Sequence, residues 1–362
     1  MKRERDMPIK IRRISIRNYK GIDALDMEFP LPRLPDDPDI FVMGSRNGLG
    51  KTSIIECCAL LLLGPMLREE RFRMRDRYSI VDVPDLLIRA GEHSAEIGGE
   101  IVLGDEAVTV EMRIDRHGSV KLSGENSKLF EKMAENRWID PESDADDLIR
   151  AICGFTPNPV IENTFLLFHS YRKVQEGNPE MGMMLRGRNP RRRPGMGPRD
   201  EFPMSAFKLQ ILRSLMGQAN LFEFDEEEGS GETIEALNKL VETYAGGTIS
   251  KLRPSPDNTI DFRVNPVRNG KSFTFDGLSS GQKEIISTLF LIWYHTRNRP
   301  SVVFIDEPEL HLNAQWHRGF VKNLIGLAPQ NQYIIATHSE DVMDSVSEDR
   351  RALLSSDQEA EE

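Results

Sequence analysis

Two adjacent carboxylates, Asp306 and Glu307, directly follow the short apolar run Val302–Ile305. A run of this length, rich in β-branched residues and followed by a turn signal, is typical of a buried strand in a parallel sheet. Ligands of open α/β folds bind at the carboxyl edge of such a sheet, and charge placed in a core must be paired or bound to a metal. The stretch therefore predicts a ligand or metal site, or a strand that ends in a solvated acidic turn.

A Gly-rich loop with the sequence MGSRNGLGKTS follows a second apolar strand, Ile40–Met43, and precedes an apolar helix. Backbone N–H groups of such a loop bind phosphates, its Lys reaches the β- and γ-phosphates, and its Ser or Thr hydroxyl holds Mg²⁺. We therefore expect Lys51 to bind ATP and Thr52 to bind Mg²⁺. The other ATP-binding residues predicted here are Asn47, Gly48, Gly50 and Ser53. The loop has Ser45 where the G-x-x-x-x-G-K-[ST] pattern has Gly, which reduces backbone freedom.

Two further motifs lie in the last third of the chain. Leu278–Gln282 reads LSSGQ and is followed by the strongly apolar helix Lys283–Tyr294. Tyr333–Ser339 reads YIIATHS and predicts another buried strand, which ends at His338. Because the LSSGQ loop opens a helix, its amide groups and the helix dipole favour anions.

These four motifs, in this order, resemble those of ABC-type ATPases. Within that class the chain is similar to the SMC and RecF branch and to the ATPases of OLD nucleases, for which DEPELHL followed by Gln315-Trp316 is typical. The resemblance implies an α/β P-loop head with a mostly parallel core sheet, an accessory antiparallel β layer, a helical insertion and no long coiled coil. It covers roughly the first 65 residues and residues 270–345.

The resemblance also assigns roles. Asp306 and Thr52 would hold Mg²⁺, Glu307 would polarise the attacking water, and His338 would contact the γ-phosphate. In the resembled families the signature loop of one subunit faces the nucleotide of another, in a head-to-tail homodimer or larger homo-oligomer that holds ATP between its heads. The residues that would act in trans are Ser279, Ser280, Gly281 and Gln282. Ser280 replaces the first Gly of the LSGGQ consensus.

Two further positions follow from the same resemblance. ABC-type ATPases place a Gln after a strand, and here Asn163–Ser170 is an apolar strand followed by YRKVQEG. Gln175 is the best-placed candidate, His169 and Arg172 compete with it, and a solvated loop is the alternative. The N-[FY]-[KR] turn near the N-terminus would bring Lys20 close to the nucleotide, unless Lys20 is only a solvated turn residue.

Composition limits the remaining possibilities. The chain of 362 residues is 39% hydrophobic and carries a formal net charge of −11, which argues against a uniformly basic nucleic-acid surface. Cys57, Cys58 and Cys153 form neither a disulfide framework nor a zinc pattern. No apolar stretch is long enough for a membrane helix, and no apolar segment follows the basic N-terminus as in a signal peptide. We therefore expect a cytoplasmic protein that does not enter the membrane.

The predicted elements divide the chain into four parts. Residues 1–130 form the N-terminal half of the head, with strands at 9–18 and 24–29 and an antiparallel layer at 95–103, 107–114 and 119–123. Residues 131–255 form a helical insertion, with helices at 144–153, 205–216 and 232–244. Residues 256–348 form the C-terminal half, which opens with a hairpin of 259–264 and 272–275. Residues 349–362 form an acidic tail.

Residues 181–203 contain six arginines, at positions 186, 188, 191, 192, 193 and 199. Such a segment could bind nucleic acid through Arg186–Arg199, bind an acidic partner, or be a solvated loop.

Too few residues follow His338 for the nuclease domain of OLD proteins. We therefore predict a Mg-dependent ATPase that gates a separate effector, a nuclease, in anti-phage defence, similar to the Septu (PtuA-like) and PARIS (AriA-like) ATPase subunits. The alternatives are a RecF-like DNA-binding ATPase in repair, and a slow ATP-dependent scaffold that holds a partner inactive.

Overall fold

The structure is a computed structural model, and it describes residues 8–34, 37–45, 50–64, 86–104, 106–117, 120–124, 149, 151–154, 160–162, 165–172, 174, 176, 208, 211–212, 230–249, 252–254, 260–268, 270–310 and 312–354. The chain forms two compact units, Met1–Arg172 with Thr296–Glu362, and Lys173–His295. The predicted boundaries after residues 130, 255 and 348 divide the chain differently and remain predictions. The segment Arg186–Arg199 lies outside the described residues.

The core of the first unit is a six-stranded sheet with the order β15-β3-β14-β13-β8-β7. Its strands are β3 (Asp39–Ser45), β7 (Val160–Glu162), β8 (Phe165–Phe168), β13 (Val302–Asp306), β14 (Gln332–Thr337) and β15 (Arg351–Leu354). All neighbours pair in parallel except β7 and β8, which are antiparallel. Every residue of β8, β13 and β14 is buried, as expected for parallel strands covered on both faces.

A second sheet in this unit is antiparallel, with five strands in the order β2-β1-β4-β5-β6. These strands are β1 (Ile9–Tyr19), β2 (Ile22–Glu28), β4 (Ser94–Leu103), β5 (Glu106–Asp115) and β6 (Val120–Gly124). Apolar and exposed residues alternate along β5, so one face of this sheet is buried and the other is exposed. The predicted accessory antiparallel layer is confirmed.

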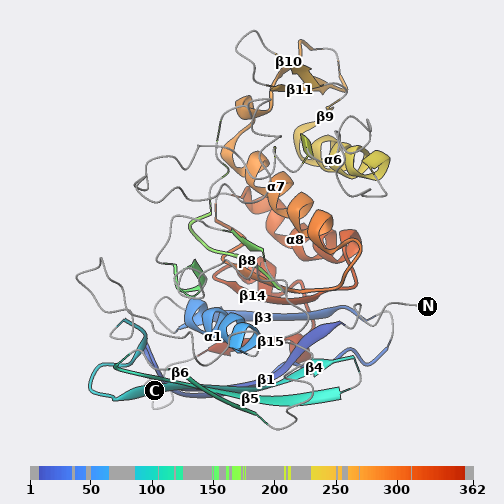
Figure 1. Ribbon diagram of the computed structural model, residues 1–362. Coiled ribbons are helices and arrows are strands. Elements are labelled where there is room, and N and C mark those ends of the chain that lie inside the picture. Colours follow the sequence, from blue (N-terminus) through green and yellow to red (C-terminus); the bar gives the residue numbers. More distant parts are fainter. Residues whose placement is uncertain are drawn as a thin grey trace, which may run out of the picture. The chain divides into compact units, whose positions relative to one another are not determined.

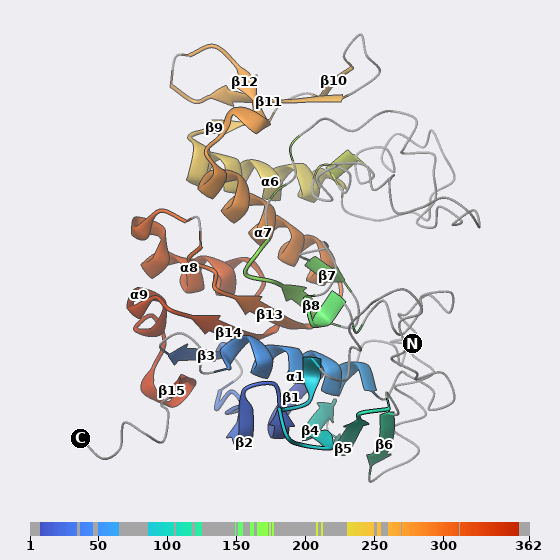
Figure 2. The ribbon, with the colours of Figure 1, turned by 90° about the vertical axis from the view of Figure 1, so that its left-hand side faces the viewer.

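Helix α1 (Lys51–Leu63) lies between the two sheets, as Figures 1 and 2 show. It packs against β14 and β13 on one side and against β1 and β4 on the other. Nearly all of its residues are buried, which explains why the sequence is apolar around the whole helix. Gly99 permits this close approach, because a Cβ there would lie 2.4 Å from the carbonyl oxygen of Arg13 and 2.5 Å from Leu61 Cδ2.

The C-terminal part of the first unit completes the parallel sheet. Helix α8 (Ala314–Leu327) connects β13 to β14, and α9 (Glu340–Met343) follows β14. The turn η5 (Glu348–Arg350) then leads into β15. Arg351–Leu354 thus pair with β3 as an edge strand, whereas the sequence analysis places them in an acidic tail. Four residues flanked by charge carry too little periodicity to predict a strand.

The second unit contains α6 (Ser230–Ala245), a small sheet and α7 (Ser280–Thr296), whose last residue belongs to the first unit. The sheet consists of β9 (Gly247–Thr248), β10 (Leu252–Pro254), β11 (Ile260–Pro266) and β12 (Phe273–Thr274). Strands β11 and β12 form the predicted antiparallel hairpin, which leads through the turn η4 (Phe275–Gly277) to the LSSGQ loop. None of the helices in the described ranges has the length and apolar character to cross a membrane.

Candidate functional site

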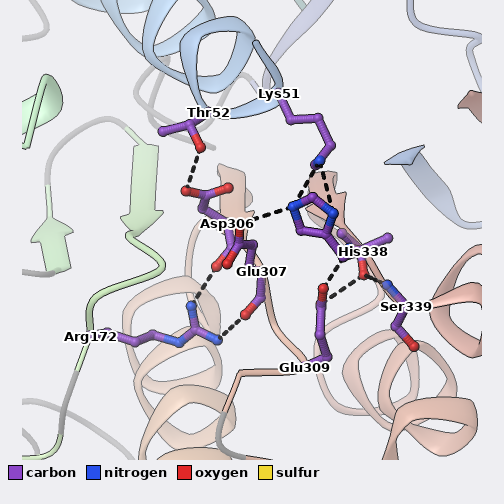
Figure 3. Close-up of polar contacts among 9 residues, drawn as sticks. Lys51, Thr52, Arg172, Asp306, Glu307, Glu309, His338 and Ser339 are labelled. Atoms are coloured by element: carbon purple, nitrogen blue, oxygen red, sulfur yellow. Dashed lines mark hydrogen bonds and ion pairs between the residues drawn. The ribbon is translucent and has the colours of Figure 1, made fainter. Parts of the chain in front are cut away.

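Four neighbouring strands end at one edge of the core sheet and carry polar residues there. Strand β3 ends next to the Gly-rich loop and β14 ends next to His338. Strand β13 ends at Asp306, directly before Glu307, and β8 leads to Arg172. Because these strands are parallel, their carboxyl ends meet at the same edge. Figure 3 shows that these side chains, together with Lys51 and Thr52 at the start of α1, face one another.

Asp306 and Thr52 contact each other directly. The Thr52 hydroxyl donates a hydrogen bond of 2.9 Å to Oδ2 of Asp306. Burial raises the pKa of Asp306 to about 6, although the Thr52 hydrogen bond opposes this shift. Oδ1 of Asp306 is buried and has no hydrogen-bond partner among the described residues. A carboxylate with one unpartnered oxygen beside a hydroxyl fits Mg²⁺, which prefers hard oxygen ligands.

Lys51, His338 and Glu307 form a contiguous polar group. The Nζ atom of Lys51 lies 3.0 Å from Nε2 and 3.3 Å from Nδ1 of His338, and Nε2 lies 3.2 Å from Oε1 of Glu307. When Nε2 carries the ring proton it donates to Glu307, and Lys51 can then donate only to Nδ1, at 3.3 Å. Burial lowers the pKa of Lys51, while the charge of Glu307 opposes this shift. A cation, an imidazole and a carboxylate thus converge where the motifs predict the terminal phosphate.

The backbone of Glu307 is in the left-handed region, with φ of 48°. This conformation costs a non-glycine residue roughly 1–2 kcal/mol, so the surroundings must hold it. The Glu307 N–H group donates a hydrogen bond of 2.8 Å to the carbonyl oxygen of Ala336 on β14. The side chain is 24% exposed and can therefore reach water. Glu307 thus combines a strained backbone with a partly exposed carboxylate, at the position predicted for the general base.

Arg172 binds the main chain on the other side of the two carboxylates. Its side chain is buried, and Nη1 donates hydrogen bonds of 2.6 Å to the Asp306 carbonyl and 3.0 Å to the His169 carbonyl. Nη2 donates a hydrogen bond of 3.1 Å to the Glu307 carbonyl. The sequence analysis considers Arg172 and His169 only as alternatives to Gln175, and Gln175 lies outside the described residues.

Glu309 is a site residue that the sequence analysis does not single out. Its Oε2 accepts a hydrogen bond of 2.7 Å from the Thr337 hydroxyl, and its Oε1 accepts one of 2.5 Å from the backbone N–H of His338. Glu309 therefore fixes the end of β14, from which the His338 side chain projects (Figure 3). The spacing within DEPEL could have pointed to a second functional acid, but its partners are far away in sequence.

The described part of the Gly-rich loop is closely packed. Gly50 has φ of 84°, and a Cβ there would lie 2.9 Å from Cγ1 of Ile22. A Cβ on Gly44 would lie 2.7 Å from Sδ of Met343, so a larger residue there would displace this methionine side chain on α9. Ser53 is half-buried in the first turn of α1. The predicted ligands Asn47 and Gly48 lie outside the described residues.

Lys20 lies beside α1 and is paired with a buried acid. Its Nζ atom lies 2.7 and 2.6 Å from the two carboxylate oxygens of Glu56, which is one helical turn beyond Thr52. The Tyr19 hydroxyl donates a further hydrogen bond of 3.1 Å to Glu56. Burial raises the pKa of Glu56, and the charge of Lys20 opposes this shift. The contact of Lys20 with a nucleotide stays a prediction.

The LSSGQ loop forms a capping box at the start of α7 in the second unit. The Ser279 hydroxyl accepts a hydrogen bond of 3.3 Å from the Gln282 backbone N–H, and Oε1 of Gln282 accepts one of 3.0 Å from the Ser279 backbone N–H. The Gln282 amide also donates a hydrogen bond of 2.9 Å to the Tyr244 carbonyl at the end of α6. Ser279 and Ser280 are exposed and Gly281 is buried.

Two lysines support this loop from within the second unit. The buried Lys208 donates a hydrogen bond of 2.7 Å to Asp276, which lies in the turn just before the loop. Lys283 in the first turn of α7 donates hydrogen bonds of 2.6 Å to Glu176 and 3.2 Å to the Asp276 carbonyl. Burial lowers the pKa of Lys208, and its hydrogen bond with Asp276 opposes this shift. These contacts hold the loop on its helix.

The chain matches two related protein families. Residues 13–242 match a family described as "AAA domain". Residues 184–344 match another described as "AAA domain, putative AbiEii toxin, Type IV TA system". The first match covers more than half of the chain.

The chain is also similar to individual proteins. The chain is 25% identical over 130 residues to the "Retron Vc95 probable ATPase" of Vibrio cholerae serotype O1 biovar El Tor, and this match spans 33% of the chain and 25% of that protein. Among solved structures, an SMC head bound to the C-winged helix domain of ScpA matches 93% of this chain and 91% of that one. Its TM-score is 0.53 and its identity 14%. The latter similarity indicates a shared fold.

Proposed function

We propose a function from the premise that the chain belongs to the AAA-domain family and is an SMC- and RecF-like ABC-type ATPase. In this proposal the chain is a Mg-dependent ATPase whose heads pair around ATP and thereby gate a separate effector in anti-phage defence. The single observation that supports the hydrolytic part most strongly is the convergence of Lys51, Thr52, Asp306, Glu307 and His338 at one edge of the core sheet.

In this proposal each residue at this edge has a separate role in hydrolysis. Lys51 binds the terminal phosphates, and Mg²⁺ would be held by the Thr52 hydroxyl and by the Asp306 carboxylate, whose Oδ1 has no partner among the described residues. When bound, Mg²⁺ neutralises charge that develops on the transferred phosphoryl group. Glu307 accepts a proton from the attacking water, a contribution typically worth about 10²–10⁴ in rate. His338 lies between Lys51 and Glu307, and a phosphate there would displace their present contacts with its ring.

The pairing of heads is proposed from the second unit. Ser279 and Ser280 are exposed at the N-terminus of α7, a helix whose first amide groups and dipole favour an anion. We propose that this loop binds the γ-phosphate held by another copy of the chain, so that each site is completed only in a head-to-tail pair. Hydrolysis would then separate the pair and time its signal.

The link to defence is supported by names of similar proteins. One matched family is described with a putative AbiEii toxin, and one similar protein is named a retron probable ATPase. Because the match spans only a quarter of that relative, the role of the whole protein, and a nuclease as its effector, belong to the proposal. The finer similarity to Septu and PARIS subunits also stays a prediction.

The first experiment compares Glu307→Gln with the unchanged protein in ATP binding, ATP turnover and mass in solution, with and without Mg-ATP. We expect normal binding, turnover reduced by about 10²-fold or more, and a larger species with Mg-ATP. A control, Glu242→Gln, removes an exposed carboxylate on α6 and should change none of these. Unchanged turnover in Glu307→Gln would remove Glu307 as the base. A mass that does not respond to Mg-ATP would contradict ATP-dependent pairing.

A further inference from the structure

We propose that Arg172 is a positioning residue for ATP hydrolysis, which holds the main chain of Asp306 and Glu307 so that the Glu307 carboxylate faces the site. The proposal rests on the proposed function, in which Glu307 activates the attacking water. Arg172 itself directs its guanidinium to carbonyl oxygens of the chain, and so it acts through Glu307.

The geometry suits a guanidinium. Nη1 and Nη2 donate to the carbonyl oxygens of two successive residues, Asp306 at 2.6 Å and Glu307 at 3.1 Å. A planar fork of fixed N–H groups can bind both oxygens at once, whereas a lysine ammonium is a single point charge on a flexible stem. The second Nη1 contact, 3.0 Å to the His169 carbonyl, fixes the fork to the end of β8. Arg172 therefore ties the end of β8 to the end of β13.

The peptide that Arg172 holds carries the unusual backbone conformation. Glu307 has φ of 48°, which a glutamate adopts only when its neighbours enforce it. Its N–H group is bound by Ala336, and its carbonyl oxygen is bound both by Arg172 and, at 3.2 Å, by the N–H group of Leu310. Without the guanidinium, the one contact that the described residues keep on the Glu307 carbonyl oxygen is the local turn bond from Leu310. It can then rotate and turn the carboxylate away from His338.

The chain offers a matched control. Arg350 is also a buried arginine of the first unit, and it donates to two successive carbonyl oxygens, those of Pro30 at 3.1 Å and Leu31 at 3.3 Å. Its carbonyl partners lie in the segment after β2. Arg350→Ala therefore removes the same kind of contact without touching Asp306 or Glu307. A purely structural role for Arg172 predicts the same behaviour from both arginines.

The test measures ATP affinity, KM, kcat and the melting temperature of Arg172→Ala, Arg172→Lys and Arg350→Ala. We expect Arg172→Ala to lower kcat by about 10²-fold, because small displacements of a catalytic group have effects of this size. ATP affinity should stay within about twofold, since Lys51 and Thr52 are untouched. Arg172→Lys should not restore kcat, whereas added guanidinium at concentrations that leave the fold intact should restore part of it in Arg172→Ala. Arg350→Ala should lower the melting temperature alone.

The double variant Arg172→Ala with Glu307→Gln decides whether the two residues act together. If Arg172 acts through Glu307, the double variant turns over ATP no more slowly than Glu307→Gln alone. Independent, multiplying losses would overturn the proposal, as would equal losses of kcat in Arg172→Ala and Arg350→Ala. Normal turnover in Glu307→Gln would instead refute the proposed function, so the two failures are distinguishable.

Discussion

The contacts of Glu309 predict that this acid stabilises the end of β14 and that its loss disturbs His338. Glu309 accepts two hydrogen bonds from β14, from the Thr337 hydroxyl and from the His338 N–H group. Hydrogen bonds to a charged group contribute roughly 1.5–3 kcal/mol each, and partial exposure favours the lower end of this range. We therefore expect Glu309→Ala to lower the free energy of unfolding by about 3 kcal/mol. This corresponds to a fall in melting temperature of roughly 6–12 °C for a unit of this size.

Two further variants separate the contributions. In Glu309→Gln the amide carbonyl can still accept from His338 N–H and the amide NH₂ can donate to Thr337, so we expect a loss below about 1 kcal/mol. Thr337→Val removes one of the two bonds with little change of volume, together with the 3.0 Å bond from Ser339 N–H to the Thr337 hydroxyl. A double-mutant cycle of Glu309→Ala with Thr337→Val should give a coupling energy of about 1–2 kcal/mol.

Chemical denaturation measures these free energies, and steady-state ATP hydrolysis shows whether the site is disturbed. Because His338 lies next to Lys51 and Glu307, a displaced His338 should lower kcat by about 10-fold while ATP binding is kept. If Glu309→Ala unfolds within about 0.5 kcal/mol of the unchanged protein, the hydrogen bonds do not contribute as argued. If it is destabilised but hydrolyses ATP normally, Glu309 does not position His338.

Three more predictions concern the nucleotide and the signature loop. The pKa of Asp306 is about 6 in the folded protein and 3.8 in the unfolded chain. Between these values the folded state binds more protons than the unfolded state. The ligand-free protein therefore loses stability through Asp306 as the pH rises from 3.8 to 6. Asp306→Asn should remove this pH dependence, raise the melting temperature at pH 7 and abolish stabilisation by Mg²⁺. A pH profile of stability that does not change would contradict the raised pKa of Asp306. Lys51→Ala should lose nucleotide binding in calorimetry, and normal affinity would exclude Lys51 as phosphate ligand. Ser280→Arg should bind ATP but stay monomeric and inactive in sedimentation and turnover assays, whereas full activity would exclude pairing through this loop.

Local patterns allowed much of the fold and of the site to be predicted. Val302–Asp306 and Gln332–Thr337 are short apolar runs that end in polar residues, and they do form buried parallel strands with their polar ends at one edge. The antiparallel layer followed from alternation, and the hairpin before the LSSGQ loop from its turn residues. In each case the signal lies within a few residues, so that period and turn chemistry are sufficient.

The contacts that hold the site together could not be predicted in the same way. Arg172 binds the carbonyl of Asp306, and Lys51 contacts His338, across 134 and 287 residues. The partner of a buried Arg or Glu depends on the order of the strands in the sheet. Strand β14 lies between β3 and β13, and no local stretch of the sequence predicts this order. The left-handed backbone of Glu307 is enforced by tertiary contacts and has no local sequence signal.

The capping box changes what the signature loop can contribute to a paired site. Gln282 has its side-chain oxygen bound by Ser279 N–H and its amide bound to the Tyr244 carbonyl, so both of its polar atoms are committed within the unit. Moving the Gln282 side chain toward a nucleotide on another subunit would break bonds that define the start of α7, a cap usually worth about 1 kcal/mol, so in its present position it can offer its second amide N–H group alone. Ser280 is exposed, and no such bond restricts its side chain among the described residues. We therefore expect Ser280 and the first amide groups of α7 to bind the phosphate, with Gln282 fixing the helix that presents them.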